Sequence, residues 1–145
     1  MTGQIGVAVN QTNYDFRDRF NAADENSSAE RDFDPIFLPS LGLEYRLDKG
    51  QIYANIGRGF SNPGLEETLT PDGVINPDIE QEKGVNYEIG GRFLWAKNRL
   101  AFNIAAYQMN IKDLLVAERI DEDQFIGRNA GETRHQGLEL DLRYR

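Results

Sequence analysis

The feature that most constrains the fold is a stretch that alternates apolar and polar residues, GVNYEIGGRFLW from Gly84 to Trp95. A β-strand sends successive side chains to opposite faces, so this spacing predicts a strand with one apolar and one charged face. The alternation recurs at 41–47 and 138–144. In the 84–95 strand the apolar face would carry Val85, Tyr87, Ile89, Phe93 and Trp95, and the polar face would carry Asn86, Glu88 and Arg92.

Nothing else in the sequence supplies a second layer that could cover these apolar faces. No amphipathic helix is evident, and every other strong segment is another alternating strand. A soluble sandwich would need a second sheet on its apolar side. The pattern therefore favours an all-β fold: an antiparallel up-and-down meander of about six long strands, forming a segment of a large transmembrane β-barrel with lipid on one side and a polar lumen on the other.

Composition excludes several other classes of protein. The net charge of −8 argues against nucleic acid as a partner, and the lack of cysteine excludes disulfides and thiolate metal sites. No apolar run is long enough for a transmembrane helix, whereas a mean hydropathy of −0.60 is compatible with barrel strands, which are apolar on one face only. No nucleophile–base pair or phosphate-binding loop is evident, so we expect no enzyme, cofactor or metal site.

The chain divides into strands joined alternately by short and long connections. Tight turns are expected at 48–50 and 96–98, long connections at 17–34 and 61–83, and a short tip at 121–124 on the same side as the long connections. Barrels of the outer membrane have short periplasmic turns and longer extracellular loops. The sequence therefore predicts the long connections on the extracellular side. The expected strands are 3–16, 37–47, 51–60, 84–95, 99–119 and 125–145, with a bulge near Ala105 where the apolar parity changes.

Three elements, in their order and spacing, carry a resemblance to a known family. Tyr53, Arg58, Gly59 and Phe60 form the first; Asn76, Pro77, Ile79, Glu82, Asn86, Tyr87, Glu88, Gly90 and Arg92 form the second; Asn129-Ala130-Gly131 followed by Gly137-Leu138-Glu139-Leu140 forms the third. Together they resemble the C-terminal half of the barrel of a TonB-dependent outer-membrane receptor, although Gln81 replaces a usual proline. The segment SNPGLEETLTPDG, residues 61–73, is most similar to segments of ferric-siderophore and ferric-citrate receptors.

The resemblance implies a place in the outer membrane of a Gram-negative bacterium and a role in importing a scarce nutrient, an iron–siderophore chelate above all. Such receptors close about 22 strands around a plug. Residues 1–145 would be a partial barrel, without plug, signal peptide or the segment that contacts the TonB energy-transducing complex. Alternatives are another cargo (a vitamin, peptide or glycan) or a soluble all-β binding or structural module. The isolated chain is expected to self-associate through its open edges.

Candidate ligand contacts follow from the expected positions of charged residues on the loops and the lumen face. Many of these charges would form a network of ion pairs along the lumen wall. His135 is the one histidine of the sequence, so we expect it to line the wall rather than to bind a metal. Tyr14, Tyr45, Trp95 and Tyr144 would anchor the membrane interfaces. The ligand-binding candidates are Arg58, Asn62, Glu66, Glu67, Asp72 and Arg92; the lumen-face charges also include Glu44, Arg46, Glu88, Glu139, Asp141 and Arg143; acidic residues crowd the loops at Asp24, Glu25, Glu30, Asp32, Asp34, Asp121, Glu122 and Asp123.

Overall fold

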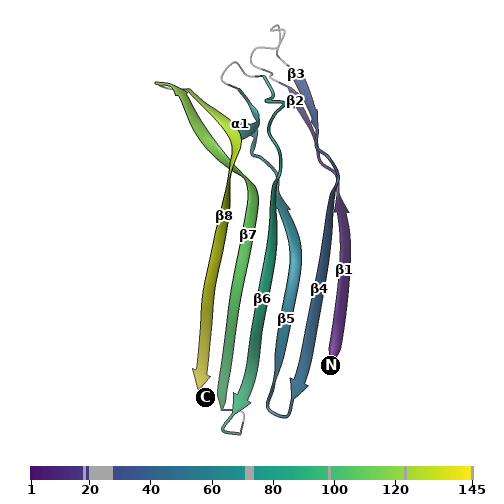
Figure 1. Ribbon diagram of the computed structural model, residues 1–145, viewed down its shortest axis with the longest axis vertical. Helices are drawn as coiled ribbons and strands as arrows, with labels where there is room; N and C mark the ends of the chain where they lie inside the picture. Colours follow the sequence, from purple (N-terminus) through teal and green to yellow (C-terminus); the bar gives the residue numbers. More distant parts are fainter. Residues whose placement is uncertain (18, 20–27, 71–73, 98, 123, 145) are drawn as a thin grey trace.

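The computed structural model describes residues 1–17, 19, 28–70, 74–97, 99–122 and 124–144, and its main element is one antiparallel sheet. Six strands lie in the order β1-β4-β5-β6-β7-β8, and β2 and β3 form a separate hairpin at one end of the sheet (Figure 1). The elements are β1 Thr2–Asn10, β2 Asn13–Arg17, β3 Ser28–Asp32, β4 Ile36–Leu47, β5 Gly50–Ser61, α1 Leu65–Thr68, β6 Glu82–Trp95, β7 Leu100–Asp121 and β8 Gln124–Tyr144.

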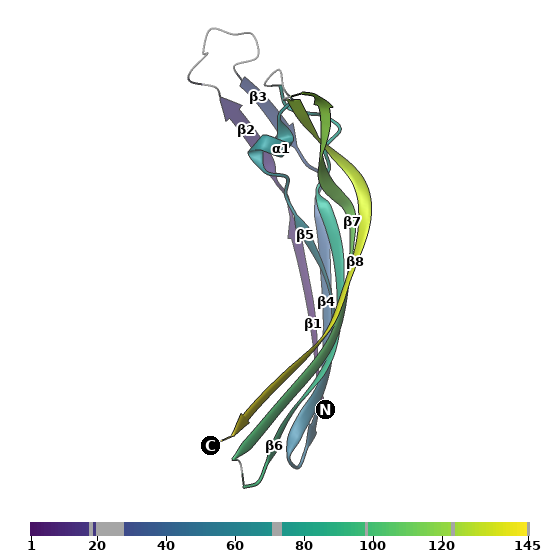
Figure 2. The same cartoon turned by 90° about the vertical axis from the view of Figure 1, so that its left-hand side faces the viewer.

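The expected meander of six long strands is confirmed, and each strand of the sheet pairs with the next one. Figure 2 shows the sheet edge-on as a curved wall, with the hairpin at one end and α1 beside the same end of the β7–β8 pair. Both termini and the two tight turns lie at the opposite end. No helix among the described residues is long and apolar enough to cross a membrane.

The tight turns follow from local backbone chemistry. Leu47 pairs directly with Gly50, so only two residues connect β4 to β5. At the other turn, Trp95 pairs with Leu100 across a four-residue connection, in which Ala96 and Lys97 have φ angles of 48° and 56°, in the left-handed region. We refer to this end of the sheet as the turn end and to the opposite one as the loop end. The connections that join β1 to β4 and β5 to β6 lie at the loop end and are long, as predicted, whereas only two residues join β7 to β8 at that end, where a short tip was expected.

Two details of the expected strand map are wrong. The predicted strand 3–16 is broken, because pairing with β4 ends at Asn10 and the chain then leaves the sheet to form β2. The predicted bulge near Ala105 is absent, since pairing continues without a shift from Leu100 to Ile111. The irregularity lies at 112–113 instead, where Asp113 has a φ of 58°. From Tyr107 onward the apolar residues of β7 lie on the opposite face of the sheet, because that face is itself apolar near the loop end.

One face of the sheet carries a continuous apolar surface, which we call the outer belt. Pairing places its side chains in rows that run across the strands, and we call each row a rung. The belt comprises Ile5, Val7, Val9, Phe37, Leu41, Leu43, Tyr45, Leu47, Ile52, Ala54, Ile56, Val85, Tyr87, Ile89, Phe93, Trp95, Leu100, Phe102, Ile104, Ala106, Leu138, Leu140, Leu142 and Tyr144. The predicted common face of Val85, Tyr87, Ile89, Phe93 and Trp95 is thereby confirmed.

The slope of the outer belt gives the tilt of the strands in the membrane. The edge of the belt nearest the loop end runs from Val9 in β1 to Leu138 in β8. When the pairing register is continued to the strand ends, the rung of Val9 and the rung of Leu138 cross β6 six residues apart. The six residues rise about 20 Å, and the five strand spacings between β1 and β8 cover about 24 Å. The belt is level in the membrane if the strands tilt by about 40°, as in known transmembrane barrels.

The outer belt is not covered by any described part of the chain. Leu138 is 70% exposed and Leu142 is 63% exposed, whereas a soluble module would bury both in a compact core. Near the turn end, the rings of Phe93, Trp95 and Phe102 stack with centroids 5.9 to 6.1 Å apart. Tyr45 and Tyr144 lie on the same face, where an aromatic girdle at the membrane boundary is expected.

The buried core lies among the loops rather than on the sheet. Its fully or largely buried members come from the β3–β4 connection and from the long segment that joins β5 to β6. They are Phe33, Ile36, Pro63, Thr68, Ile75, Asn76, Ile79 and Gln81. The loop end therefore carries a small packed unit, which we call the loop cluster.

Candidate functional site

The face opposite the outer belt is polar and would line the lumen of a closed barrel. The pairing register brings its charged and amide side chains together from all six strands. They include Gln4, Glu44, Arg46, Asn55, Asn86, Glu88, Arg92, Asn103, His135, Glu139, Asp141 and Arg143. Several acids and bases pair along one strand: Arg46 Nε lies 3.3 Å from Glu44 Oε1, and Arg143 Nε lies 3.1 Å from Asp141 Oδ1.

Arg92 and Tyr53 lie at the centre of this inner face. The Arg92 guanidinium lies over the Tyr53 ring, 5.2 Å from its centroid, so the ring faces a cation. Both residues line two polar hollows of about 220 and 340 Å³. The first hollow also contains Glu44 and Glu88, and the second contains Glu139 and Asp141. This part of the wall can bind a polar ligand through both signs of charge.

Two inner tyrosines lie flat against the wall because a glycine stands opposite each of them. Tyr53 pairs with Gly90, and a Cβ on that glycine would be 2.5 Å from the tyrosine ring. Tyr107 pairs with Gly137 in the same manner, at 2.7 Å. Aromatic rings that cover strand glycines in this way stabilise the pairing. The two rings leave the lumen free instead of projecting into it.

The inner face becomes apolar toward the loop end. A hollow of about 280 Å³ there is lined by Gly59, Phe60, Ser61, Glu82, Gly84, Asn86, Met109 and Ile111. A Cβ on Gly59 would meet nothing within 4 Å, and one on Gly84 would make only ordinary contacts with the Asn110 carbonyl oxygen and Ile111. A ligand that entered from the loop end would thus meet an apolar surface first and the charged surface around Arg92 afterwards.

The loop cluster joins segments that are far apart in sequence. Tyr14 of β2 donates its hydroxyl hydrogen to the carbonyl of Pro63 at 2.8 Å, and Arg31 of β3 donates to the carbonyl of Ile79 at 3.0 Å. Burial first, and the nearby Glu67 carboxylate second, raise the pKa of the Tyr14 hydroxyl above its ordinary value. The hairpin is therefore docked on the segment that joins β5 to β6. Tyr14 consequently lies in the loop cluster and not at the membrane interface, so its predicted anchoring role is wrong.

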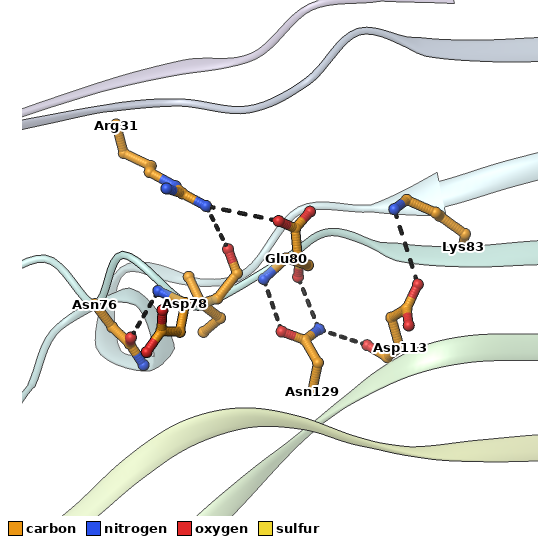
Figure 3. A network of polar contacts seen from close by, with 8 residues as sticks. Arg31, Asn76, Asp78, Glu80, Lys83, Asp113 and Asn129 are labelled. Atoms are coloured by element: carbon orange, nitrogen blue, oxygen red, sulfur yellow. Dashed lines mark hydrogen bonds and ion pairs between the residues drawn. The ribbon is translucent and has the colours of Figure 1, made fainter.

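A second set of contacts ties that segment to the long β7–β8 pair (Figure 3). The Asn129 side chain accepts a hydrogen bond from the Glu80 amide at 2.7 Å and donates to the carbonyls of Glu80 and Asp113 at 2.9 and 2.7 Å. Asn76 donates to the Gly127 carbonyl at 3.0 Å. A Cβ on Gly127 would lie 2.4 Å from the Glu67 carbonyl oxygen, so α1 packs directly on this glycine. We call these contacts the asparagine clamp.

The asparagine clamp brings together residues of the second and third sequence elements. Asn76 and Ile79 come from the second element and Asn129 from the third. Their side chains meet or lie within the loop cluster, where Asn76 is 6% and Ile79 is 0% exposed. The sequence singled out these residues, but it gave no sign that the two elements contact one another. Arg31, which bridges the cluster through the Ile79 carbonyl and lies 3.9 Å from Glu80, had no signal at all.

The six candidate ligand contacts are dispersed by the structure. Arg92 lies on the inner face as predicted. Asn62 accepts a hydrogen bond from Gln81, and Glu67 accepts one from the Gly64 amide, so both are engaged in local structure. Asp72 lies outside the described residues, as do Asp24, Glu25 and Asp123, and the structure does not describe the Glu66 side chain. Within the described part of the chain, no group of acids and His135 is placed to hold a metal ion.

The prediction that Arg58 faces the lumen is wrong. The alternation of β5 places its side chain on the outward face with Ile52 and Ile56, opposite Val85. Arg58 lies between Gly57 and Gly59, which carry no side chains, and it borders a hollow on the inner face. The error came from treating every charged residue of the wall as a lumen residue.

Comparison with known proteins agrees with this architecture. The siderophore receptor PirA from Pseudomonas aeruginosa superposes with a TM-score of 0.65 at 22% identity, over 79% of this chain and 26% of PirA. The copper transporter OprC gives 0.73 at 18% identity, over 99% of this chain and 24% of OprC. The hemophore receptor HasR from Serratia marcescens gives 0.62 at 17% identity, over 99% of this chain and 27% of HasR.

These solved structures share the fold of the chain, and the chain spans about a quarter of their length. A family model described as "TonB dependent receptor-like, beta-barrel" matches residues 2–145, which is nearly the whole sequence. Members of this family lie in the outer membrane of Gram-negative bacteria, where the outer belt would meet lipid. The chain belongs to the TonB-dependent receptor β-barrel family.

Proposed function

We propose that this chain forms part of the wall and extracellular loops of a receptor that imports an iron–siderophore chelate across the outer membrane. The observation that carries the proposal is the match of residues 2–145 to the receptor barrel family. The inner face supports it, because an apolar hollow at the loop end leads to the charged surface around Tyr53 and Arg92. A chelate with an apolar periphery and polar iron-binding groups would match an entrance that is apolar first and charged further inside.

Partners of the receptor follow from the same proposal. Transport would draw energy from the TonB complex, which would contact a part of the receptor beyond these residues. We expect no catalytic activity, because the family model that the chain matches describes a receptor barrel. Arg92 and Tyr53 would bind the cargo by charge and by the ring face, and the loop cluster would hold the entrance in a fixed shape.

Other cargo stays open as the second candidate. The solved relatives include a heme–hemophore receptor and a copper transporter as well as siderophore receptors. A vitamin, peptide or glycan would also suit a polar lumen. Acidic residues on the hairpin, such as Glu30 and Asp32, would repel an anionic chelate, so the basic residue Arg92 would have to attract it further inside.

The test is uptake by a strain that lacks the intact receptor gene. Under iron starvation, we expect loss of radioiron uptake from one chelate in a panel of ferric siderophores, and restoration by the wild-type gene. Arg92→Ala should lower that uptake, whereas Arg143→Ala near the turn end should leave it close to wild type. Unchanged uptake and growth across the panel would overturn the iron assignment, and loss of heme or copper uptake would favour the second candidate.

Removal of the whole 61–83 connection is a poor test of cargo binding. This connection supplies Ile75, Ile79 and Thr68 to the loop cluster, and its last residues belong to β6. Its deletion would disrupt packing as well as any ligand contact. Single substitutions on the inner face separate the two effects.

A further inference from the structure

We infer that the cargo of this receptor is a ferric hydroxamate chelate, which is neutral or cationic, and not an anionic chelate. This assignment rests on the proposed function and adds the chemical class of the cargo. Two adjoining hollows of the inner face and the acidic surface at their entrance support it.

The two hollows differ in what they offer a ligand. The hollow of about 280 Å³ that contains Met109 and Ile111 is the apolar hollow. A second one of about 440 Å³ shares Gly59 and Asn86 with it, and we call it the amide hollow because three side-chain amides border it: Gln4, Asn55 and Asn86. Among the described residues, none forms a hydrogen bond with these amides, whereas Asn103 on the same face is bonded to Asp141. Their N–H donors and oxygen acceptors are therefore available to a ligand.

Within their described lining, neither hollow has a base that faces the lumen. The charged residue of the apolar hollow is Glu82, whose carboxylate accepts a hydrogen bond from the Leu115 amide at 2.8 Å. The charged residue of the amide hollow is Arg58, and its side chain points to the outward face. An anionic ligand would lose its hydration here without gaining a positive partner, which makes its binding unfavourable.

Further inside, Arg92 gives the wall no excess of positive charge. The two polar hollows that it lines contain four acids: Glu44, Glu88, Glu139 and Asp141. Glu44 and Asp141 pair with arginines of their own strands, which leaves two carboxylates to balance Arg92. Arg92 can still donate hydrogen bonds to the oxygens of a ligand, but its attraction for an anion is cancelled.

The entrance to the hollows is strongly acidic. Three segments extend from the sheet at the loop end, 11–35, 62–81 and 112–132, and they contain 18 acids and six bases. The segment 62–81, which supplies most of the loop cluster, has no lysine or arginine. Charge of this sign lowers the concentration of anions at an entrance and raises that of cations, over a screening distance of about 8 Å at physiological ionic strength.

Ferric hydroxamates match these surfaces, and ferric catecholates do not. Each hydroxamate group carries one negative charge, so three of them neutralise ferric iron, whereas catecholate groups carry two each and leave the complex anionic. The hydroxamate oxygens would accept hydrogen bonds from Asn55, Asn86 and Arg92. The methylene chains of the chelate would contact Met109 and Ile111. A free amine on the chelate would add attraction to the acidic entrance.

The test compares ferric chelates of different charge on the intact receptor in detergent. Binding is measured by quenching of tryptophan fluorescence with ferrioxamine B, which is cationic, ferrichrome, which is neutral, and ferric enterobactin, which is anionic. We expect the better hydroxamate to bind roughly 100-fold more tightly than the catecholate. Added sodium chloride should slow the association of ferrioxamine B and leave that of ferrichrome unchanged.

Two variants with matched controls test the hollows themselves. Gly59→Leu fills the space that both hollows share without a clash in the wall, so we expect roughly tenfold weaker binding of the hydroxamate. Gly131→Leu is its control, because a Cβ there also meets nothing within 4 Å and the residue lines neither hollow. Asn86→Asp loses the amide donor and should weaken binding about fivefold. Asn110→Asp, on the outward face, should bind as wild type does.

The outcomes separate this assignment from the proposed function. Tighter binding of ferric enterobactin than of either hydroxamate would overturn the chelate class and leave iron import standing. Equal losses for Gly59→Leu and Gly131→Leu, with a circular dichroism spectrum that shows both folded, would overturn the binding site. If no ferric chelate bound and the deletion strain kept its radioiron uptake, the proposed function itself would be refuted.

Discussion

At the scale of single residues, the wall depends on contacts that are too close to tolerate an added atom. Glycines opposite Tyr53 and Tyr107 let the rings lie against the backbone, and Gly127 lets α1 approach β8. None of these three roles concerns turns or positive φ angles. Glycine in these strands is required by what lies opposite or above it.

Replacement of Gly137 by valine should therefore displace the Tyr107 ring and weaken the β7–β8 pairing. A Cβ would lie 2.7 Å from the ring, so we expect a cost of about 2 kcal/mol in the free energy of unfolding, the usual range for overpacking. Urea titration of the intact receptor in phospholipid vesicles measures it. Gly131→Ala is the control, because a Cβ there meets nothing within 4 Å; equal losses for both variants would contradict the argument.

The Tyr14 hydroxyl should make docking of the hairpin sensitive to alkaline pH. The folded pKa lies above the unfolded value near about 10, so its contribution is fully present below that pH and is lost as the pH rises through the folded pKa. Tyr14→Phe removes the hydrogen bond to Pro63, at a cost of about 1 kcal/mol, together with this pH dependence.

The difference in tyrosinate absorbance between wild type and Tyr14→Phe, followed from neutral to alkaline pH, gives the pKa of that one group. A midpoint at or below the value of free tyrosine would show that Tyr14 is neither buried nor influenced by Glu67. Tyr144→Phe serves as the control, since its exposed ring lies at the turn end, where Tyr144 pairs with Leu100.

At the scale of elements, the asparagine clamp holds residues 74–81 on the β7–β8 pair. Asn129→Ala removes three hydrogen bonds and leaves the amide and carbonyl of Glu80 without that partner. We expect a loss of about 2 kcal/mol in docking, because each hydrogen bond contributes about 1 kcal/mol and water can replace part of the two bonds to the exposed Glu80 backbone. Hydrogen exchange at 74–81 should accelerate, while exchange in β4 and β5 should stay unchanged.

Asn103→Ala is the matched control for the clamp. Asn103 makes one side-chain hydrogen bond, to Asp141 at 3.2 Å on the inner face, so its loss should leave exchange at 74–81 unaltered. If Asn129→Ala also left that segment protected, the packing of Ile75 and Ile79 alone would hold the loops. The clamp would then be incidental to loop order.

The elements also show what the sequence could and could not reveal. Alternation predicted the strands and the outer belt correctly, because lipid and lumen impose opposite polarity on the two faces. It failed for Arg58, because the outward face at this rung lies beyond the apolar belt, where a charged residue does not indicate the lumen. It failed at Ala105, where apolar Met109 and Ile111 belong to the inner face.

The loop cluster lay beyond this kind of reasoning for a different reason. Its contacts join residues separated by about fifty positions, such as Tyr14 with Pro63 and Asn76 with Gly127. No periodicity encodes such pairs. Family-like motifs marked Asn76 and Asn129 as important, but a ligand role and a packing role leave the same mark in a single sequence.

At the scale of the whole molecule, the described sheet is an open wall with two edges and one uncovered apolar face. β1 and β8 each pair on one side only, and the outer belt is exposed from end to end. Exposed strand edges template pairing with other strands, and apolar patches of this size require cover. A barrel needs at least eight strands to close, so six strands cannot remove the edges by themselves.

We therefore expect the isolated 145-residue chain to self-associate in plain buffer and to disperse only in detergent or lipid. Sedimentation velocity in buffer should show oligomers, and addition of a maltoside detergent should reduce them. Replacement of Leu138, Leu140 and Leu142 by serine should weaken the association, because it interrupts the belt next to the β8 edge. The same change on the inner face, Glu139→Ser/Asp141→Ser/Arg143→Ser, alters no belt residue and should leave the association intact. A monodisperse monomer of the wild-type chain in buffer would mean that it covers its belt by some internal packing, contrary to the open wall seen here.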